Sequence, residues 1–442
     1  MGVEVVTVLI TMLTSLGDET IESAVRDELR SAGNQVSTHD LAHERFAPCQ
    51  GCFECWVVHP GTCKARDSAN EVMRDVIASD AVLWLVAPRF GAWDPVAKAA
   101  LDKVIGLVSP FFAKIAGETH HRLRYERYPR WAVLAVSGPE QSARERDMFR
   151  TLVERNVLNL QVHSPFVAFA DALDPVRFRA MADDALAHLT ADHPDHHWKT
   201  LEPLPAVDGA AGPDVGNRNA VLWVGSAKKR GTSTSEAVGT ALTRRLERRG
   251  WQCRTVHAAT VTKLGRSGSV ELVDAARSAS LLVLASPVYV DCLPALVLKG
   301  LGDLVDASGG GVGPAVLPIV QCGFPEATHT RLAVEILAQA VSGAGWAWAG
   351  HLAFGAGGFI DGADIDAGRR FQKLQQALDQ VAAALDAGEP VPPDVTSALS
   401  EPLVNPAVYR WMGDVGWLAQ AARHGALTDL WQRPFASPTA AP

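Results

Sequence analysis

The sequence has no excess of basic charge: 41 Lys and Arg stand against 49 Asp and Glu, giving a net charge of −8. Nucleic acids and anionic membranes attract proteins through clustered positive charge, so neither is expected as the main partner. No apolar run reaches the roughly 20 residues that a membrane helix needs. The first apolar run, 3–13, is too short to span a bilayer and lacks the basic flank of a secretion signal. We therefore expect a cytoplasmic protein with no membrane partner.

The glycine signatures of Rossmann and Walker loops are also missing from Val221–Ser235, where an apolar run leads through a polar loop into a helical pattern. Free backbone N–H groups and the helix dipole favour an anion at such a turn. Lys228 adds positive charge, and the loop hydroxyls are those of Ser226, Thr232, Ser233, Thr234 and Ser235. Such a loop suits a terminal monophosphate, as in FMN. The other interpretation is an ordinary turn whose Ser and Thr only cap the helix.

Residues 3–190 alternate apolar, strand-like runs with amphipathic, helix-like patterns. This alternation predicts an α/β fold, a doubly wound parallel sheet with helices on both faces. The expected strands are 5–10, 36–40, 81–87, 131–137 and 166–169, and the expected helices are 20–32, 71–78, 95–109 and 140–159. A segment rich in Pro, Gly and Asp, 191–218, follows as a linker.

The pattern then starts again, which indicates an internal repeat. Ser79–Phe90 corresponds to Ala279–Tyr289, and the pair Lys98 and Asp102 corresponds to Lys299 and Asp303. Because the order of elements is the same, we expect two copies of one domain in tandem. The predicted division is 1–190, linker 191–218, 219–390, and a tail 391–442 that packs across both copies.

The first copy is longer between its first helix and its third strand, and this extra length carries four of the seven cysteines, Cys49, Cys52, Cys55 and Cys63. An odd cysteine count without a secretion signal does not suggest a disulfide framework. Compact runs of this kind, here C-x2-C-x2-C-x7-C, hold iron–sulfur clusters. Two alternatives stay open: metal-free, redox-active thiols, and zinc, although zinc sites usually separate their cysteine pairs more widely.

Two further loops of the second copy follow predicted strands, at the edge where open α/β sheets bind ligands. The first contains Pro287, Val288, Tyr289 and Val290, in which proline restricts the backbone before it and the tyrosine can lie along a flat ring. The second contains Gly323 and Phe324, where glycine permits close backbone approach. Together with the hydroxyl-rich loop, they predict a site for a phosphorylated aromatic cofactor.

The second copy resembles the NADPH-dependent FMN reductase branch of the flavodoxin-like superfamily. The residues that carry the resemblance are Gly225–Ser226, Ser233–Ser235, Ser286–Tyr289 and Gly323. The resemblance implies two flavodoxin-like domains in tandem. It also implies FMN phosphate on the first loop, the isoalloxazine between the other two, and NAD(P)H as co-substrate. The first copy departs from the pattern, because Asp18 and Glu19 replace the basic residues of its loop. They would repel a phosphate, or equally cap a helix, which leaves flavin binding by this copy open.

The cysteine run resembles that of iron–sulfur flavoproteins, which implies a [4Fe–4S] cluster on Cys49, Cys52, Cys55 and Cys63. In those proteins cluster and flavin meet across a subunit interface. One chain with two copies would form that interface internally, as a pseudo-dimer, and a homodimer stays open as well.

The resemblance predicts an FMN-dependent oxidoreductase that passes electrons from NAD(P)H to a quinone, a flavin, another small molecule or a protein acceptor. Because the flavin supplies the chemistry, no nucleophilic side chain is required, and the catalytic residues stay unknown. One alternative is an electron-transfer protein without its own small-molecule substrate. Another is a non-catalytic interaction protein that keeps the fold.

Overall fold

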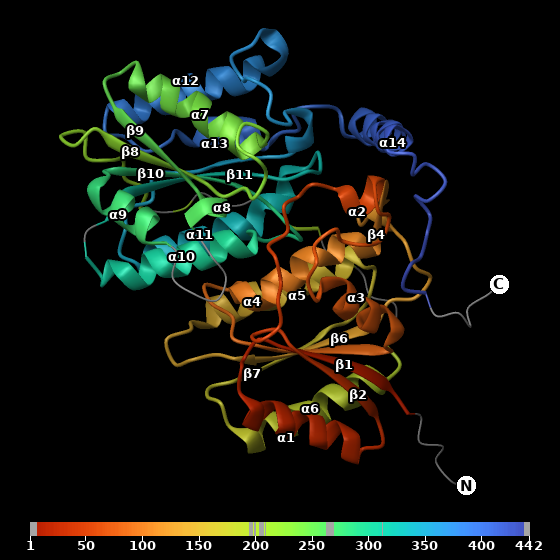
Figure 1. The fold of residues 1–442 in the computed structure, drawn as a ribbon. Helices are drawn as coiled ribbons and strands as arrows, with labels where there is room; N and C mark the ends of the chain where they lie inside the picture. The colour runs from red at the N-terminus through yellow and green to blue at the C-terminus, as the bar shows by residue number, and fades with distance from the viewer. Residues whose placement is uncertain are drawn as a thin grey trace.

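The computed structural model describes residues 7–193, 198, 200–202, 207, 209–261, 269–311 and 313–436. They form two five-stranded sheets and one two-stranded sheet (Figure 1). We call residues 7–193 the first half, the described residues of 209–390 the second half, and 391–436 the tail. Within the described chain, no helix has both the length and the apolar character that crossing a bilayer requires.

The first half contains a parallel sheet in the order β2-β1-β3-β6-β7. Its strands are β1 (Leu9–Thr14), β2 (Gln35–Asp40), β3 (Ala81–Val86), β6 (Arg130–Val136) and β7 (Phe166–Ala170). Its helices are α1 (Glu19–Ser31), α2 (Glu54–Val57), α3 (Ala69–Ala78), α4 (Pro95–Leu101), α5 (Ala143–Asn159) and α6 (Pro175–Thr190). These elements confirm the predicted alternation, although β1 lies later than the expected 5–10, of which 5–6 fall outside the described residues.

The second half repeats this topology, in the order β9-β8-β10-β11-β12. Its strands are β8 (Asn219–Val224), β9 (Gln252–His257), β10 (Leu281–Pro287), β11 (Ala315–Gln321) and β12 (Leu352–Phe354). Its α-helices are α7 (Thr234–Glu247), α8 (Ala258–Val261), α9 (Val270–Ser278), α10 (Ala295–Ser308), α11 (Arg331–Gly343) and α12 (Gln372–Asp386), and its 3-10 helices are η2 (Ala327–Thr330), η3 (Gly357–Phe359) and η4 (Arg369–Phe371). The strand order 2-1-3-4-5 in each half confirms the doubly wound fold class.

The repeat extends to local geometry at the end of the third strand of each half. Strands β3 and β10 are buried along their whole length, as expected for parallel strands covered on both faces. Each strand leads into a tight turn, closed by the Arg89 N–H on Ala92 O (2.9 Å) in the first half and the Tyr289 N–H on Cys292 O (2.8 Å) in the second. Both turns place two successive residues at positive φ, as a type I′ turn requires.

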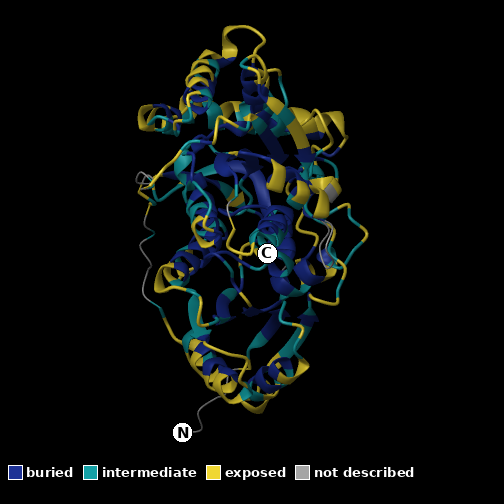
Figure 2. Cartoon of the chain, turned by 90° about the vertical axis from the view of Figure 1, so that its left-hand side faces the viewer, coloured by how far each residue is buried: buried dark blue, intermediate teal, exposed yellow. Residues whose placement is uncertain are grey.

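Buried apolar side chains form three clusters that explain how the halves are joined. Figure 2 shows the buried parts of the chain gathered in the interior of the molecule and the exposed parts at its outside. One cluster lies between the first sheet and its outer helices α1 and α6. Another lies between the second sheet and its outer helices α7 and α12. The third contains residues of both halves, such as Trp84 and Leu301, and α4 packs against α10 there. The two sheets therefore share a continuous apolar interior through their inner helices.

An antiparallel hairpin, β4 (Val108–Ile115) and β5 (Glu118–Leu123), corrects the prediction of one helix over 95–109. The helix ends at Leu101, and a 3-10 helix, η1 (Asp102–Leu107), leads into the hairpin. The hairpin turn places Ala116 and Gly117 at positive φ, which gives it the twist that two-residue hairpins favour. The hairpin thus follows from turn geometry and aromatic strand residues rather than from helical periodicity.

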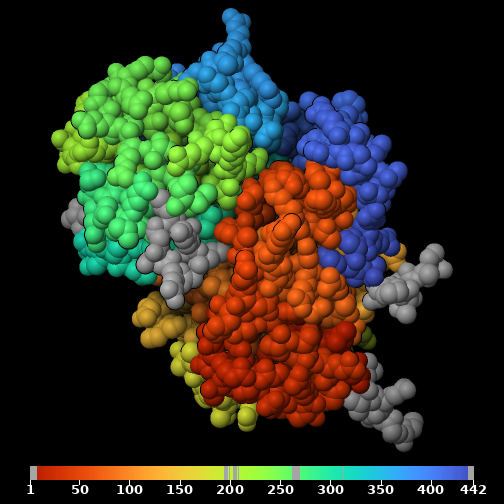
Figure 3. Space-filling model, in the orientation of Figure 1, coloured from red at the N-terminus to blue at the C-terminus, as the bar shows by residue number. Residues whose placement is uncertain are grey.

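The tail contains α13 (Pro393–Ser400) and α14 (Pro406–Arg423) and contacts both halves (Figure 3). The Tyr409 hydroxyl donates to Gly323 O (2.6 Å) of the second half, and the Phe112 N–H of the first half donates to Asp414 Oδ1 (2.9 Å). The tail therefore packs against both halves, as expected from the sequence. In the described chain no strand or helix crosses the predicted division at 190, 219 or 390, and the division itself stays a prediction.

Candidate functional site

The hydroxyl-rich loop between β8 and α7 is buried at its two ends, exposed between them, and partly hydrogen-bonded to itself. Ser233 caps α7 by accepting from the Glu236 N–H (3.1 Å), and the Thr234 hydroxyl donates to Gly357 O (2.8 Å). The exposed Thr232 hydroxyl donates to Lys229 O (2.6 Å). Ser235 differs, because its side chain is 2% exposed and its Oγ has no hydrogen-bond partner among the described residues.

The charges of this loop have both signs. Lys228 lies with its Nζ 3.3 Å from Asp361 Oδ1 and 5.7 Å from the centre of the Phe53 ring, which belongs to the first half. Glu236 accepts the Gly231 N–H (2.6 Å), so a carboxylate occupies one of the loop amides. The Ser226 Oγ accepts from the Lys228 N–H (3.2 Å), which folds the start of the loop back on itself. An anion here would meet lysine and buried hydroxyls after displacing that carboxylate.

The loop after β10 points its tyrosine toward the first half. Pro287 is buried, Val288 donates its N–H to Gln321 O (2.8 Å), and Val290 is at φ 51° in the tight turn. A Cβ added at Gly51, between two cysteines of the first half, would collide with the Tyr289 hydroxyl. Burial raises the pKa of Tyr289 well above its usual value. The cysteine run therefore touches the predicted flavin loop, as the internal pseudo-dimer requires.

The loop after β11 combines an open glycine with a packed aromatic ring. Gly323 is exposed, and a Cβ added there would meet nothing within 4 Å. Phe324 instead lies with its ring centre 5.1 Å from that of His121 in β5 and 4.7 Å from that of His329 in η2. Burial lowers the pKa of His121 to about 3, so its imidazole is neutral. The open edge of this loop is at Gly323, whereas Phe324 faces the boundary between the halves.

Four free thiols line one cavity of about 460 Å³ in the first half, those of Cys49, Cys52, Cys55 and Cys63. Cys52 is exposed and the other three are half-buried. Burial raises the pKa of Cys49 to about 12 and that of Cys55 still further. The four cysteines that the sequence spacing groups together therefore line the same cavity, and their role as ligands of one centre stays a prediction.

A buried lysine, which the sequence pattern does not reveal, adjoins these thiols. Lys103 Nζ lies 3.4 Å from Cys63 Sγ and 3.6 Å from Asp67 Oδ2. Burial lowers the pKa of Lys103, but Cys63, Asp67 and Cys49 together raise it above its usual value, so the amine stays protonated. Lys103 lies in η1, far from the cysteines in sequence, which is why no local motif indicates it.

The arrangement of the four cysteines bears on the choice between zinc and an iron–sulfur cluster. Among the described residues, no three or more His, Cys, Asp or Glu side chains are placed to hold a single metal ion. Zinc needs four ligands at about 2.0–2.3 Å from one point, so this arrangement does not suit it. A cuboid cluster separates its cysteine ligands and fills the space between them, which fits four thiols around a cavity. The [4Fe–4S] cluster itself stays a prediction.

The corresponding loop of the first half is occupied by carboxylates. Asp18 caps α1 by accepting the Thr20 N–H (3.0 Å), so the capping interpretation of this residue is confirmed. Glu22, buried behind it, accepts from the Thr14 hydroxyl (2.9 Å), and burial raises its pKa. The Ser15 hydroxyl donates to Asp94 Oδ2 (2.6 Å). These acids lie where the second half has hydroxyls and lysine, which disfavours a phosphate.

A buried charged cluster at the boundary between the halves is also absent from the sequence prediction. Arg155 of α5 lies 2.6 Å from Glu118 Oε2 and 3.1 Å from Asp291 Oδ1, and its Nη2 donates to His329 Nδ1 (3.2 Å). Burial would raise the pKa of Asp291, but Arg155 and His329 outweigh it and hold the pKa well below its usual range. These residues come from four separate segments, so no spacing connects them.

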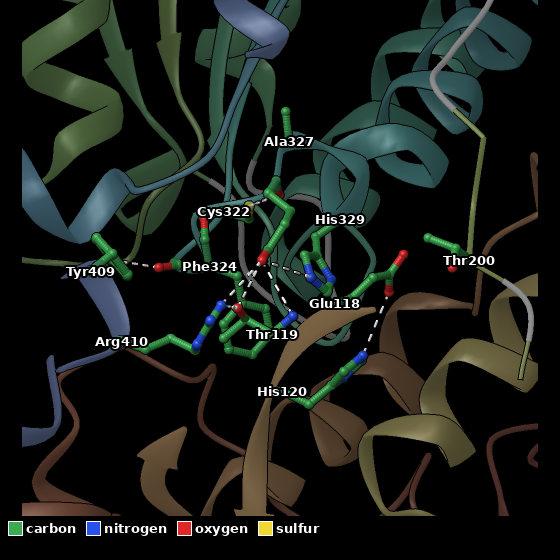
Figure 4. Close-up of polar contacts among 12 residues, drawn as sticks. Glu118, Thr119, His120, Thr200, Cys322, Phe324, Ala327, His329, Tyr409 and Arg410 are labelled. Carbon is green, nitrogen blue, oxygen red and sulfur yellow. Dashed lines mark hydrogen bonds and ion pairs between the residues drawn. The ribbon is translucent and has the colours of Figure 1, made fainter. Parts of the chain in front are cut away.

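Glu326 extends this cluster toward the tail, and Figure 4 shows its partners Thr119, His329 and Arg410 lying close together. It accepts from the Thr119 hydroxyl (2.9 Å), and its carboxylate lies 3.8 Å from His329 Nε2 and 3.7 Å from Arg410 Nη1 of α14. The hairpin, η2 and the tail therefore meet beside Phe324. This contact fixes the loop after β11 against the first half.

No family model and no curated protein matches this chain. Several solved structures are similar to part of it. The NAD(P)H:quinone oxidoreductase from Methanothermobacter marburgensis is 14% identical, with 41% of this chain and 98% of that chain covered and a TM-score of 0.32. The FMN-dependent NADH-azoreductase from Bacillus anthracis str. Ames Ancestor, in complex with FMN, is 11% identical, with 41% and 100% covered and a TM-score of 0.30. An azoreductase from Bacillus anthracis str. Sterne is 10% identical, with 41% and 97% covered and a TM-score of 0.29. Matches at these scores do not establish a family.

Proposed function

We propose that the protein is an FMN-dependent oxidoreductase that takes electrons from NAD(P)H and passes them to a quinone, a flavin or another small-molecule acceptor. FMN binds the second half, and Cys49, Cys52, Cys55 and Cys63 of the first half hold a [4Fe–4S] cluster. The observation that carries this proposal is the contact of Gly51 with the Tyr289 hydroxyl, which joins the cysteine run to the loop after β10.

The residues between β8 and α7 fit the phosphate of FMN. Ser235 supplies a buried hydroxyl without a partner, at the positive end of the α7 dipole. Leaving such a group unpaired costs about 1–3 kcal/mol, which a phosphate oxygen would recover. Lys228 adds positive charge at the edge of the loop, while Glu236 has to release the Gly231 N–H as the phosphate enters. These features together support an anion site at the start of α7.

FMN, when bound, supplies hydride acceptance and electron transfer. The chain positions it: the turn at Tyr289 and the backbone at Gly323 flank the ring, and the first half closes the site from the side of Gly51. Gly323 leaves the open edge at which NAD(P)H and the acceptor approach in turn.

The thiol-lined cavity favours a second candidate, an electron-transfer protein without its own small-molecule substrate. A flavin accepts electrons in pairs, whereas an iron–sulfur centre transfers them one at a time. Such a centre beside the flavin would therefore pass the two electrons on singly. Metal-free thiols at the same place would instead favour the reductase. The two functions differ in whether electrons leave through a small molecule or through a protein carrier.

The test is anaerobic purification of the full chain, followed by absorbance spectroscopy, assays of iron and sulfide, and identification of the released flavin. We expect flavin bands, FMN on release, and about four irons per chain, as one [4Fe–4S] cluster requires. NAD(P)H oxidation with a quinone then separates the reductase from the electron-transfer protein. A colourless protein that takes up no FMN would contradict the proposal and favour the non-catalytic alternative.

A further inference from the structure

The thiol-lined cavity is unusual in its charge. Four cations line it, Arg45, Lys64, Arg66 and Lys103, and no carboxylate is among its described lining residues. The whole chain carries a net charge of −8, so this concentration of positive charge is local. A centre held by four thiolates is anionic, and the cavity wall complements that charge.

Lys103 is the one buried cation of this wall. Its side chain is 4% exposed, whereas Arg45, Lys64 and Arg66 are exposed. Asp67, its partner, accepts the Ala47 N–H (2.7 Å) and the Ala69 N–H (3.1 Å), so the carboxylate is fixed. The ammonium group therefore lies within 3.6 Å of both the Cys63 thiol and the Asp67 carboxylate. Solvent screens the exposed cations, but it reaches Lys103 very little.

We propose, on the basis of the function proposed above, that Lys103 raises the reduction potential of the centre held by the four cysteines. Reduction adds one electron, delivered from NAD(P)H by way of FMN, and no bond forms or breaks at the cysteines. The reduced centre carries one more negative charge than the oxidised centre. A fixed positive charge at short range in a poorly screened site therefore stabilises the reduced form more strongly than the oxidised form. Lys103 therefore favours the flow of electrons from flavin to the cysteine centre.

The experiment is anaerobic potentiometry of the full-length protein, with the cluster followed by absorbance. Lys103→Met should lower the midpoint potential by about 59 mV or more, a tenfold change in a one-electron equilibrium. Lys103→Arg keeps the charge and should stay near the wild type. Arg66→Met removes an exposed cation of the same cavity and is the matched control, because screening should leave the potential unchanged. Asp67→Asn removes the compensating carboxylate and should raise the potential.

An unchanged midpoint potential in Lys103→Met, with the cluster loaded, overturns the inference while the proposed function stands. If Lys103→Met does not retain the cluster, Asp67→Asn decides: a raised potential supports the inference and an unchanged one overturns it. If the wild type holds no iron and sulfide, the cluster of the proposed function fails and this inference fails with it. The iron assay on the wild type therefore separates the two failures.

Discussion

At the scale of single residues, Ser235 carries the most specific information about the predicted phosphate site. Its neighbours Ser233 and Thr234 already have partners within the fold, so their hydroxyls serve the helix and the adjoining segment. Ser235 is equally buried and has none among the described residues. Of the twelve buried side-chain atoms without a partner in the described part of the chain, the Ser235 hydroxyl is the one in the first turn of α7, where an anion would bind.

Replacing Ser235 with Ala should weaken FMN binding by roughly tenfold, since a hydrogen bond to a charged group contributes about 1.5–3 kcal/mol. Quenching of flavin fluorescence on titration of the apoprotein measures this dissociation constant. Thr232→Ala is the control, because that hydroxyl is exposed and bonded to Lys229 O (2.6 Å). Equal affinity of wild type and Ser235→Ala would remove Ser235 from the site.

Two Lys–Asp ion pairs at matching positions of the two halves show how burial changes the contribution of an ion pair to stability. Lys98 and Asp102 form a hydrogen-bonded ion pair with side chains 0% and 1% exposed, and Lys98 also donates to Tyr289 O (3.0 Å) across the boundary. Lys299 and Asp303, their counterparts in the repeat, form the same pair with both side chains 22% exposed. The two pairs differ mainly in their surroundings.

Lys98→Met should lower the free energy of unfolding by about 3–5 kcal/mol, because it leaves Asp102 buried without its cation. Lys299→Met should cost only about 0–1 kcal/mol, because water solvates the remaining carboxylate. Urea denaturation followed by circular dichroism measures both. Similar losses at the two positions would contradict the distinction.

At the scale of elements, the two strand-to-helix loops of the repeat have diverged in opposite directions. Between β8 and α7 lie hydroxyls and lysine. The first half instead has Asp18 before α1 and Glu22 in the first turn of α1, and its loop residue Ser15 donates to Asp94. A phosphate placed in the first loop would meet like charges in a partly desolvated site, which is strongly unfavourable.

The chain should therefore bind one FMN rather than two. The ratio of flavin to protein, from absorbance of the saturated and washed protein with a quantitative amino-acid assay, should be close to one. Ser235→Ala should lower this ratio at subsaturating FMN, whereas Ser15→Ala in the first loop should leave it unchanged. A ratio near two would show that the acids of the first loop do not prevent binding.

Much of this architecture is predictable from the sequence, because parallel strands and amphipathic helices leave strong local patterns. The buried run at 81–87 and the helix starting near Thr20 were predicted within about a residue of β3 and α1. The internal repeat placed the second sheet by the same means. The four cysteines also line one cavity, and residues this close in sequence can be grouped without knowledge of the tertiary structure.

The elements and contacts that were missed depend on non-local packing. The helix expected over 95–109 ends at Leu101, and the hairpin β4–β5 has no counterpart in the sequence prediction, since Val108–Ile115 gives no decisive helical or alternating period. Lys103 and Arg155 act across the fold, on Cys63 and Asp291 respectively, and neither has a local motif. Charged residues that come together only in the folded protein have no characteristic spacing in the sequence, so no sequence pattern indicates them.

At the scale of the whole molecule, Arg155 joins the halves, because it pairs with Asp291 of the second half as well as with Glu118 of its own half. The pKa values of Glu118 and Asp291 lie below their usual range, because Arg155 and the nearby imidazoles outweigh the effect of burial. A carboxylate whose pKa is depressed by folding contributes stability above its unfolded pKa, about 3.9–4.3, and loses it as the pH falls toward the folded value. The free energy of unfolding should therefore fall below about pH 5.

Arg155→Met should lower the free energy of unfolding by about 3–5 kcal/mol at pH 7, because two buried carboxylates lose their partner. The difference from the wild type should shrink as the pH falls below about 4, because the unfolded chain then takes up protons on both carboxylates while the folded wild type resists their protonation. Chemical denaturation between pH 3 and pH 8 measures it. Arg150→Met, on the same helix but in an exposed pair with Asp147, is the control and should change stability little at any pH. A difference that is constant with pH would contradict the assignment.

The apolar cluster shared by the two sheets also bears on how the chain is made. The ribosome adds about 5–20 residues per second, so the first half is complete for roughly 10–40 s before the second has emerged. During that interval its inner layer, including α4, has no covering from α10. A nascent chain in this state exposes the surface that chaperones bind. Because both halves belong to one chain, the first half is exposed to aggregation until the second half has been synthesised. The yield of folded protein in cells should therefore depend on chaperone supply more strongly than the stability of the finished protein suggests.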